Sequence, residues 1–375
     1  MANTQVLSGL ELTKWQRKFL GEYIRDSGFE PYMGDSEMDI ISVVNDLRTD
    51  GYTIRIPLMG RLQGNGVSGS APLSGAEQQL DQYYQDISWE FYRQAVTADK
   101  KSKRKSAVDF MAQAKPRLRD WSAELIKYQL IDSFHKMSGG EKFSTADATA
   151  RNLFSANNVD RILYGKTQAN YSATHATGLT AIDNTDDKLS TSMASLARFM
   201  ARQARPMIRP FKTGTQGREY FVMFCHPLGF RDLKADTVMQ AANRDARARD
   251  VDSNPLFQDG DLIYDGIIFR EIPEFYQPRF GSVTSASVGA NPETTFSNGT
   301  IICGASFLCG AQAIGFVNKQ EPLPTKKNED DYGFVDGVGI ELAHGIDKLR
   351  WNNNTSGPNN GKDVGIVTVY HAAVA

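Results

Sequence analysis

Residues 61–75 read RLQGNGVSGSAPLSG, a glycine-rich stretch on which the choice of fold depends. Gly64, Gly66 and Gly69 have the G-x-G-x-x-G spacing of dinucleotide-binding folds. In those folds a strand precedes the glycines and a helix begins on them, so that the helix N-terminus binds the pyrophosphate. The stretch is therefore either a cofactor site, which would indicate a nucleotide-dependent oxidoreductase, or a flexible loop in a protein of another class.

The flanking residues favour the loop. Apolar and polar side chains alternate over residues 52–58, which predicts a strand, and Pro57 cannot donate to a ladder, which places that strand at an edge. Residues 70–75, SAPLSG, favour a loop where the cofactor site would need a helix. Alternation resumes over residues 86–91. The sequence thus predicts a two-stranded ribbon over about residues 50–96 with a glycine-rich end.

This predicted ribbon carries many aromatic side chains. They include Tyr83, Tyr84, Trp89, Phe91 and Tyr92. An isolated two-stranded ribbon is only marginally stable in water, so such side chains need a surface to cover. Where the body of the same chain does not supply that surface, we expect a neighbouring subunit to supply it.

Composition indicates a folded protein without an unusual charge. Of the 375 residues, 41% are hydrophobic and 23% charged, and this length suits two or three domains. The net charge of −2 excludes a global basic field that would recruit nucleic acid. Three cysteines cannot form a closed disulfide framework, and no run approaches the roughly 20 apolar residues of a membrane span. The N-terminus has no secretory signal pattern, so we expect folding in a reducing cytoplasm.

The remaining pattern predicts a mixed α+β chain. Helices are expected over residues 10–24, from near residue 106 with an interruption or restart at Pro116, over 190–204 and around 235–249. Strands are expected over residues 220–225, 262–269, 311–317 and 364–370, with a hairpin turn at Asn298-Gly299. The last strand is apolar on both faces and is therefore predicted to be buried.

The sequence contains no recognisable catalytic or metal-binding motif. No two of the five histidines are spaced i, i+4, and the cysteines Cys225, Cys303 and Cys309 match no zinc spacing, so packed thiols are favoured. Asp261, Asp265 and Gly266 resemble part of a calcium loop, but isoleucines occupy its middle ligand position, 263, and its twelfth position, 272. We therefore predict no catalytic residue, cofactor or metal.

A basic run follows the ribbon. It contains Lys101, Lys103 and Arg104, with lysines at 100 and 105. Such a run is either a solvated face or a contact for phosphates or for acidic residues of a neighbouring subunit.

Several segments, in the same order along the chain, are similar to one protein family. They are NDL at residues 45–47, GYTIRIPL at 51–58, LQGNG at 62–66, LSGAEQQL at 73–80, CHP at 225–227 with DL at 232–233, NPLF at 254–257 with YDG at 264–266, and CGAQA at 309–313. Together they resemble the N4-type major capsid proteins of tailed bacteriophages over about residues 10–375. The sequence departs at Gln78, where that family often has a second acid, and in its long basic run.

The resemblance implies an α+β fold of the HK97 type, with its parts in a set order. These are an N-terminal arm at residues 1–49, an extended E-loop at 50–98, a peripheral domain at 99–180 with a spine helix at 116–137, an axial domain at 181–310, and a return to the peripheral domain at 311–375. On this interpretation the glycines let the tip of the E-loop conform to another subunit and bind no nucleotide.

The resemblance also implies a function. The chain would assemble with itself into hexamers and pentamers of an icosahedral head in the host bacterial cytoplasm. The head would enclose double-stranded DNA and would work with portal and scaffolding or decoration proteins, without a membrane. Residues expected at subunit contacts are Trp15, Phe19, Arg61, Gly64, Gly66, Gly69, Tyr84, Trp89 and Phe91, with Lys101, Lys103 and Arg104 as a charged contact. A nucleotide-dependent oxidoreductase and a cellular nanocompartment shell remain alternatives.

Overall fold

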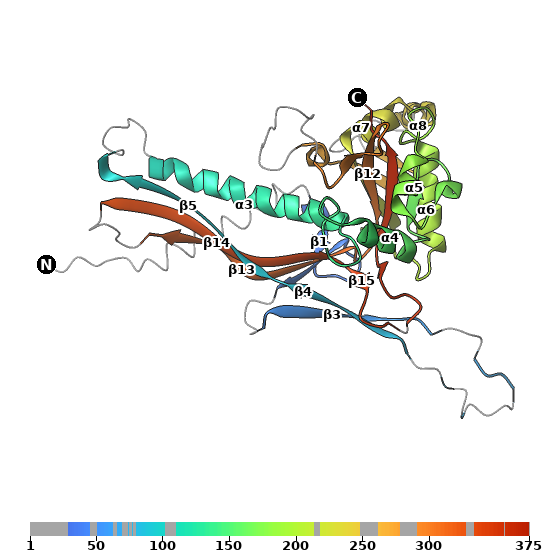
Figure 1. The fold of residues 1–375 in the computed structure, drawn as a ribbon, viewed down its shortest axis with the longest axis horizontal. Coiled ribbons are helices and arrows are strands. Elements are labelled where there is room, and N and C mark those ends of the chain that lie inside the picture. Colours follow the sequence, from blue (N-terminus) through green and yellow to red (C-terminus); the bar gives the residue numbers. More distant parts are fainter. Residues whose placement is uncertain are drawn as a thin grey trace.

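The chain has an elongated part and a compact lobe (Figure 1). The computed structural model describes residues 29–45, 51–62, 66–69, 74, 77, 80–101, 110–213, 218–247, 262–277, 291–327, 334–355 and 357–374. The elongated part is a five-stranded sheet with a long helix lying along it, and the lobe is an eight-stranded sheet covered by shorter helices. The predicted α+β class is confirmed.

The five-stranded sheet combines strands from both ends of the chain. Its order is β1 (Met33–Gly34), β2 (Ile41–Asn45), β13 (Ile314–Lys326), β14 (Val335–Lys348) and β5 (Glu90–Asp99). β13 is longer than the strand predicted over residues 311–317, because it continues antiparallel to β14 past two register shifts between Asn318 and Leu323. β-bulges of this kind bend a strand without ending its pairing.

The long helix is continuous where the sequence predicts an interruption. α3 runs over Phe110–Phe134 with Pro116 inside it. A proline in a helix interior removes one hydrogen bond and costs about 3 kcal/mol. Packing offsets this cost, because Leu118 is buried against Ile340 of β14 immediately after the proline. The predicted start near residue 106 lies outside the described residues.

The compact lobe is built on the second sheet. Its order is β6 (Ile162–Tyr164), β17 (Ile366–Ala372), β12 (Ile302–Cys309), β8 (Arg218–Cys225), β10 (Ile267–Glu271) and β9 (Leu262–Tyr264), with β11 (Thr295–Ser297) on β12 and β7 (Phe211–Thr213) on β8. Its helices are α4 (Ala148–Asn157), α5 (His175–Thr180), α6 (Thr191–Gln203), α7 (Pro227–Ala235) and α8 (Thr237–Arg247). Every residue of β17 is buried, as predicted. The segment 311–375 is therefore divided between the two sheets.

Two hairpin turns explain local differences from the predicted strands. The turn at Asn298-Gly299 is confirmed, since β11 and β12 are antiparallel and Gly299 has a φ of 96°. The single strand predicted over residues 262–269 is wrong, because Asp265 and Gly266 have φ values of 48° and 67° and turn β9 into β10. Positive φ at two successive residues is typical of a tight hairpin.

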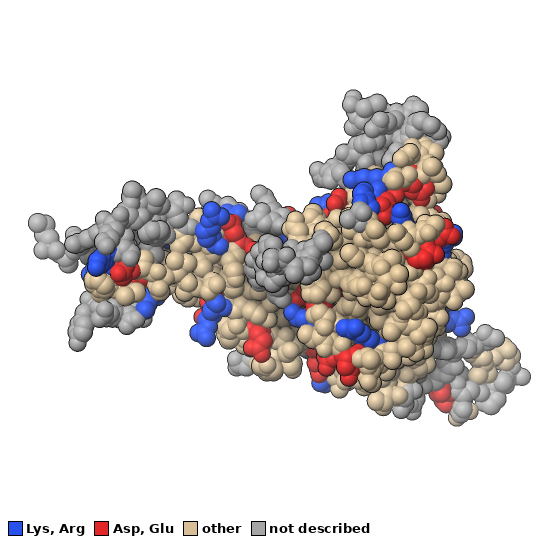
Figure 2. Space-filling model, turned by 45° about the horizontal axis from the view of Figure 1, so that its top comes forward, with Lys and Arg blue, Asp and Glu red and all other residues tan. Residues whose placement is uncertain are grey.

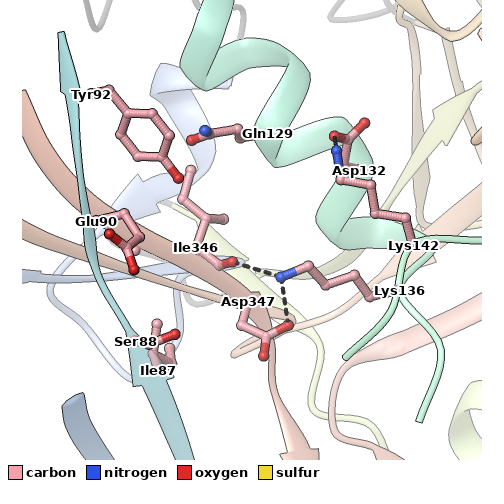
Figure 3. A pocket seen from close by; sticks show the side chains of 11 residues that line it. Ile87, Ser88, Glu90, Tyr92, Gln129, Asp132, Lys136, Lys142, Ile346 and Asp347 are labelled. Atoms are coloured by element: carbon pink, nitrogen blue, oxygen red, sulfur yellow. Dashed lines mark hydrogen bonds and ion pairs between the residues drawn. The ribbon is translucent and has the colours of Figure 1, made fainter. Parts of the chain in front are cut away.

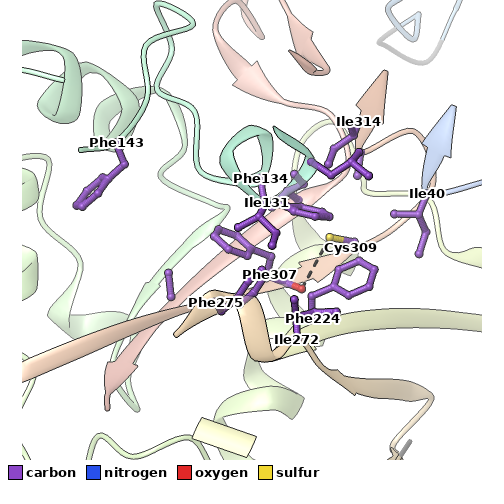
Figure 4. Close-up of a cluster of buried hydrophobic side chains, with 14 of the residues drawn as sticks. Ile40, Ile131, Phe134, Phe143, Phe224, Ile272, Phe275, Phe307, Cys309 and Ile314 are labelled. Carbon is purple, nitrogen blue, oxygen red and sulfur yellow. Dashed lines mark hydrogen bonds between the residues drawn. The ribbon is translucent and has the colours of Figure 1, made fainter. Parts of the chain in front are cut away.

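Aromatic rings join the two parts of the molecule (Figure 4). Phe134, at the end of α3, has its ring centroid 5.2 Å from that of Phe224 on β8 and 5.6 Å from that of Phe307 on β12. All three side chains are completely buried. The end of the long helix is thus fixed in the core of the lobe.

Short elements complete the fold. They are the two-stranded sheets β3 (Thr53–Met59) with β4 (Gln82–Ser88) and β15 (Arg350–Trp351) with β16 (Lys362–Asp363), and 3-10 helices at Glu30–Tyr32, Gln168–Asn170 and Pro273–Phe275.

Candidate assembly interface

The predicted ribbon exists but is shorter than expected. β3 and β4 pair antiparallel from Thr53 opposite Ser88 to Met59 opposite Gln82. Residues 90–99 do not continue the ribbon, because they form β5 and pair with ten residues of β14. Local alternation predicts a strand here but cannot say which partner the strand will take.

One face of the ribbon packs against its own chain. Ile54 and Ile56 of β3 and Ile87 of β4 contact a cluster that includes Val317 and Leu349. Ile87 is only 1% exposed. On this inner face the body of the same chain therefore supplies the surface, because the alternation of a strand places every second side chain on the subunit's own sheet.

Tyr83 shows the same behaviour on β4. Its side chain is 2% exposed, and its ring centroid lies 5.4 Å from that of Trp351 in β15.

The outer face is polar and is held by a cross-strand pair. The Arg55 guanidinium donates to both carboxylate oxygens of Asp86, at 2.8 and 3.0 Å, and lies 3.8 Å from the centre of the Tyr84 ring. The hydrogen bond from Arg55 lowers the pKa of the Asp86 carboxyl. Because Arg55 is 60% exposed, solvent screens the pair, which therefore contributes little to stability.

The base of the ribbon is an aromatic corner. The Trp89 indole N–H donates to the Gly51 carbonyl oxygen at 2.8 Å, and the Tyr52 hydroxyl donates to Glu90 at 2.6 Å. The rings of Trp89 and Phe91 are 5.3 Å apart. Trp89 is half-buried by these contacts, whereas Phe91 remains 51% exposed.

At the end of the paired strands and beyond it, the ribbon exposes large apolar side chains. They are Met59, Leu62, Val67 and Leu80. Gly66 and Gly69 have φ values of 68° and 72°, and apart from its chain neighbours a Cβ atom added at either glycine would meet no atom of the described residues within 4 Å. Arg61 is exposed, and Gly64 lies outside the described residues.

The arrangement around the glycines excludes a dinucleotide fold at this site. Residues 66–69 are not helical, and the strands before and after the glycines are antiparallel. The cofactor site would need a helix beginning on the glycines and a parallel second strand.

The other predicted contact residues are only partly described. Lys101 is exposed just after β5, where the Lys100 N–H donates to the Phe334 carbonyl oxygen at 3.0 Å. Trp15, Phe19, Lys103 and Arg104 lie outside the described residues. On the face shown in Figure 2, basic and acidic side chains are interspersed over both parts of the molecule.

A cavity of about 380 Å³ lies where the ribbon meets the long helix (Figure 3). Ser88 and Glu90 line it from one side, and α3 and β14 from the other. The Lys136 ammonium lies 3.2 Å from the Asp347 carboxylate and donates to the Ile346 carbonyl oxygen. A second pair joins Lys142 to Asp132 at 2.8 Å. The contacts of Lys136 thus join the residues just after α3 to β14, whereas Lys142 contacts α3 itself.

The histidines and cysteines are structural. All five histidines are at most 2% exposed, and the three cysteines are buried and form no disulfide. Within the described residues no three histidine, cysteine or acidic side chains are grouped as a metal site requires. Burial lowers the pKa of the imidazoles, to about 4 for His175 and His371 and about 3 for His226 and His344. These four side chains are therefore neutral at pH 7.

A buried polar network, which the sequence pattern does not reveal, crosses the junction between the two parts. His135, next to the end of α3, contacts the Glu293 carbonyl oxygen through Nδ1 and the Tyr370 hydroxyl of β17 through Nε2, at 2.7 Å. His175 contacts the Tyr164 hydroxyl at 2.9 Å, and the Tyr164 and Tyr370 rings are stacked. These residues lie far apart in the sequence, so no local spacing relates them.

A buried ion pair lies close to this junction. Lys348, at the end of β14, is 2.8 Å from the carboxylate of Asp363, and both side chains are almost completely buried. Arg161 donates through Nε to the Asp363 carbonyl oxygen at 2.7 Å. Removing one partner of a buried pair leaves the other charge buried and unpaired, which is strongly destabilising. The pair therefore favours the arrangement of the junction in which both partners meet.

None of the described helices has the length and apolarity needed to cross a membrane.

The comparisons with known proteins agree over the whole chain. The model of the phage capsid protein family matches residues 3–375. The major capsid protein of Pseudomonas phage KPP25 is 26% identical over 381 residues, which cover 98% of this chain and 96% of that protein. The capsid structure of cyanophage Pam1 is 32% identical, with a TM-score of 0.77 and coverage of 100% and 99%. The capsid of Ralstonia phage GP4, at 20% identity and 92% and 91% coverage, shares the fold with a TM-score of 0.65. The chain therefore belongs to the phage capsid protein family and is a major capsid protein with the HK97-like fold.

Proposed function

We propose that this chain assembles into hexamers and pentamers of an icosahedral phage head and has no catalytic activity. The observation that carries the proposal is the ribbon, whose far end exposes Met59, Leu62, Val67 and Leu80 without a covering surface among the described residues. Several large apolar side chains exposed on one segment are typical of an interaction site. In a shell the neighbouring copy provides the missing surface.

The parts of an HK97-type subunit map onto the described elements. We assign residues 1–49 to the N-terminal arm and 50–98 to the E-loop, with β3 and β4 as its ordered ribbon. We assign residues 99–180, with α3 as the spine helix, and the strands of 311–375 in the five-stranded sheet to the peripheral domain, although β6, α4 and α5 within 99–180 lie in the compact lobe. Residues 181–310 form the axial domain, whose sheet also receives β17.

The proposed contacts of the E-loop follow from exposure. Arg61, Tyr84, Trp89 and Phe91 lie on or beside the ribbon, and Gly66 and Gly69 allow its far end to adapt to another surface. Trp15, Phe19 and Gly64 belong to the same proposed interface. Lys101, Lys103 and Arg104 follow β5 in the sequence. They would contact acidic groups of a neighbouring subunit or packaged DNA.

The proposed cargo is double-stranded DNA, bound without sequence preference. A net charge of −2 suits a shell protein rather than a protein that condenses DNA, because strong phosphate binding needs a concentrated patch of basic residues. Assembly in the host cytoplasm, with portal and scaffolding or decoration proteins, completes the proposal. A nanocompartment shell would differ in its cargo, which would be an enzyme.

Electron microscopy tests the proposal directly. Expressed with the scaffolding protein of its phage, the chain should form closed shells, and particles from infected cells should contain DNA that nuclease cannot reach. A stable monomer or dimer by light scattering under the same conditions would contradict assembly. Shells that enclose an enzyme and no DNA would favour the nanocompartment.

A further inference from the structure

The open edges of the described sheets differ in how they are protected against pairing. β1 is two residues long, and β6 and β9 are three residues long. β5, in contrast, has ten residues without proline, pairs with β14 in an unbroken register, and has no described strand on its other side. A long, regular, unprotected edge is a template for another strand.

Hydrogen bonds show which backbone groups of β5 face this edge. The Lys100 N–H donates to the Phe334 carbonyl oxygen, so even-numbered residues direct their N–H groups toward β14. Since successive backbone groups of an antiparallel strand alternate in direction, those of Arg93, Ala95 and Thr97 face away from β14. Consistent with this, the Ala95 N–H is hydrogen-bonded to the side-chain oxygen of Gln94, at 3.3 Å.

The edge of β3 provides an internal contrast. The Gly60 N–H donates to the Asp81 carbonyl oxygen, so even-numbered residues of β3 face β4 and odd-numbered residues face outward. Pro57 is odd-numbered and removes an outward N–H group in the middle of the strand. The ribbon's edge is therefore blocked by a proline, whereas the edge of β5 is not.

We propose that the open edge of β5 pairs with an extended strand of a second copy of this chain. The proposal rests on the proposed function, because a shell brings copies of one chain into contact on every side. The side chains of residues 93–97 are all exposed in the single subunit, so an incoming strand meets no obstacle among the described residues. At about 3.3 Å per residue, the ten residues offer an edge roughly 33 Å long.

Proline substitutions at neighbouring positions test the proposal. Ala95→Pro removes an outward N–H group, whereas Val96→Pro removes an N–H group that pairs with β14. The proposal predicts that Ala95→Pro changes the melting temperature of the isolated subunit by less than about 3 °C and lowers the yield of shells at least tenfold. Thr97→Pro should behave like Ala95→Pro. Val96→Pro is the matched control and should destabilise the isolated subunit.

Amide hydrogen exchange provides a test that needs no substitution. In wild-type shells the Arg93, Ala95 and Thr97 amides should exchange at least tenfold more slowly than in isolated subunits. The amides of residues 94 and 96 should be slow in both states.

Three outcomes would overturn the proposal. The first is a wild-type yield of shells for Ala95→Pro. The second is exchange of the odd-numbered amides that is equally fast in shells and in isolated subunits. The third is exchange that is already slow in isolated subunits, which would place a segment of the same chain on the edge. Failure of the proposed function is distinguishable from all three, because the wild-type chain would then form no shells.

Discussion

The ribbon of β3 and β4 and the junction between α3 and the compact lobe use their large side chains in opposite ways. At the junction, Phe134, His135 and Tyr370 are completely buried and contact partners from several elements. On the ribbon, only alternate side chains are buried, and Met59 and Leu62 at its far end are about 60% exposed. The comparison indicates that the stability of the subunit resides at the junction, while the far end of the ribbon is available to other subunits. We therefore expect changes at the junction to destabilise the isolated subunit more than changes at the outer face and far end of the ribbon.

Acid should produce the largest loss of stability, because it acts on several buried histidines together. In the unfolded chain a histidine takes up a proton near pH 6.5, whereas the folded-state pKa is about 4 for His175 and His371 and about 3 for His226 and His344. The stabilisation from each neutral imidazole is therefore complete above pH 6.5 and is lost as the pH falls toward the folded-state pKa. Between pH 7 and pH 5 each should cost about 2 kcal/mol.

Urea unfolding at fixed ionic strength across this pH range measures the effect. The variant His344→Gln removes one titrating group. The number of protons taken up on unfolding, and with it the slope of the free energy of unfolding against pH, should therefore fall by up to one proton. A free energy of unfolding that stays constant from pH 7 to pH 5 would contradict the burial of these histidines as neutral groups.

Truncation of a junction ring should be the next largest effect. Phe134→Ala removes a completely buried side chain that contacts Phe224 and Phe307, and should lower the free energy of unfolding by about 3–5 kcal/mol. The matched control is Phe199→Ala, since Phe199 is 57% exposed and its loss should change the value by less than about 0.5 kcal/mol. Chemical denaturation of both variants makes the comparison, and equal losses would show that α3 does not depend on the junction.

Removal of the outer pair of the ribbon should have a small effect on the subunit. Arg55→Ala breaks the contacts with Asp86 and with the Tyr84 ring, but Arg55 is exposed, so the loss of stability should be much smaller than that of Phe134→Ala and should shrink further in high salt. Thermal melting at low and high salt provides the measurement. A loss of several kcal/mol would mean that the outer face is part of the subunit's core.

The smallest effect on the subunit should come from shortening the far end of the ribbon. Replacing residues 63–74 by a four-residue turn removes no described side chain that packs on the body, so circular dichroism and the melting temperature should match the wild type. The yield of shells should nevertheless fall strongly. Ile87→Ala is the matched change on the inner face and should destabilise the subunit by about 2–5 kcal/mol. A shortened variant that unfolds would contradict the division between the two regions.

Local patterns in the sequence were sufficient for several elements. The seven residues of β17 are mostly apolar on both faces and all buried, and the Asn298-Gly299 pair specifies a hairpin turn, so each can be recognised from a few adjacent residues. The same applies to the described glycines of the ribbon's far end, since residues 66–69 are not helical. These features depend on backbone preferences and on periodicity, which are properties of neighbouring residues.

The tertiary structure alone decided which surfaces these elements cover. Alternation predicts a strand at residues 90–99 but not its pairing with β14 about 250 residues later, and it does not say that Ile87 packs against Val317. The contact between His135 and Tyr370 joins residues 235 positions apart. Long-range pairing and burial depend on the free energy of the whole core, in which apolar groups distant in the sequence are buried together and polar groups find hydrogen-bond partners. A period of two or 3.6 residues therefore identifies a strand or a helix and leaves its partner open.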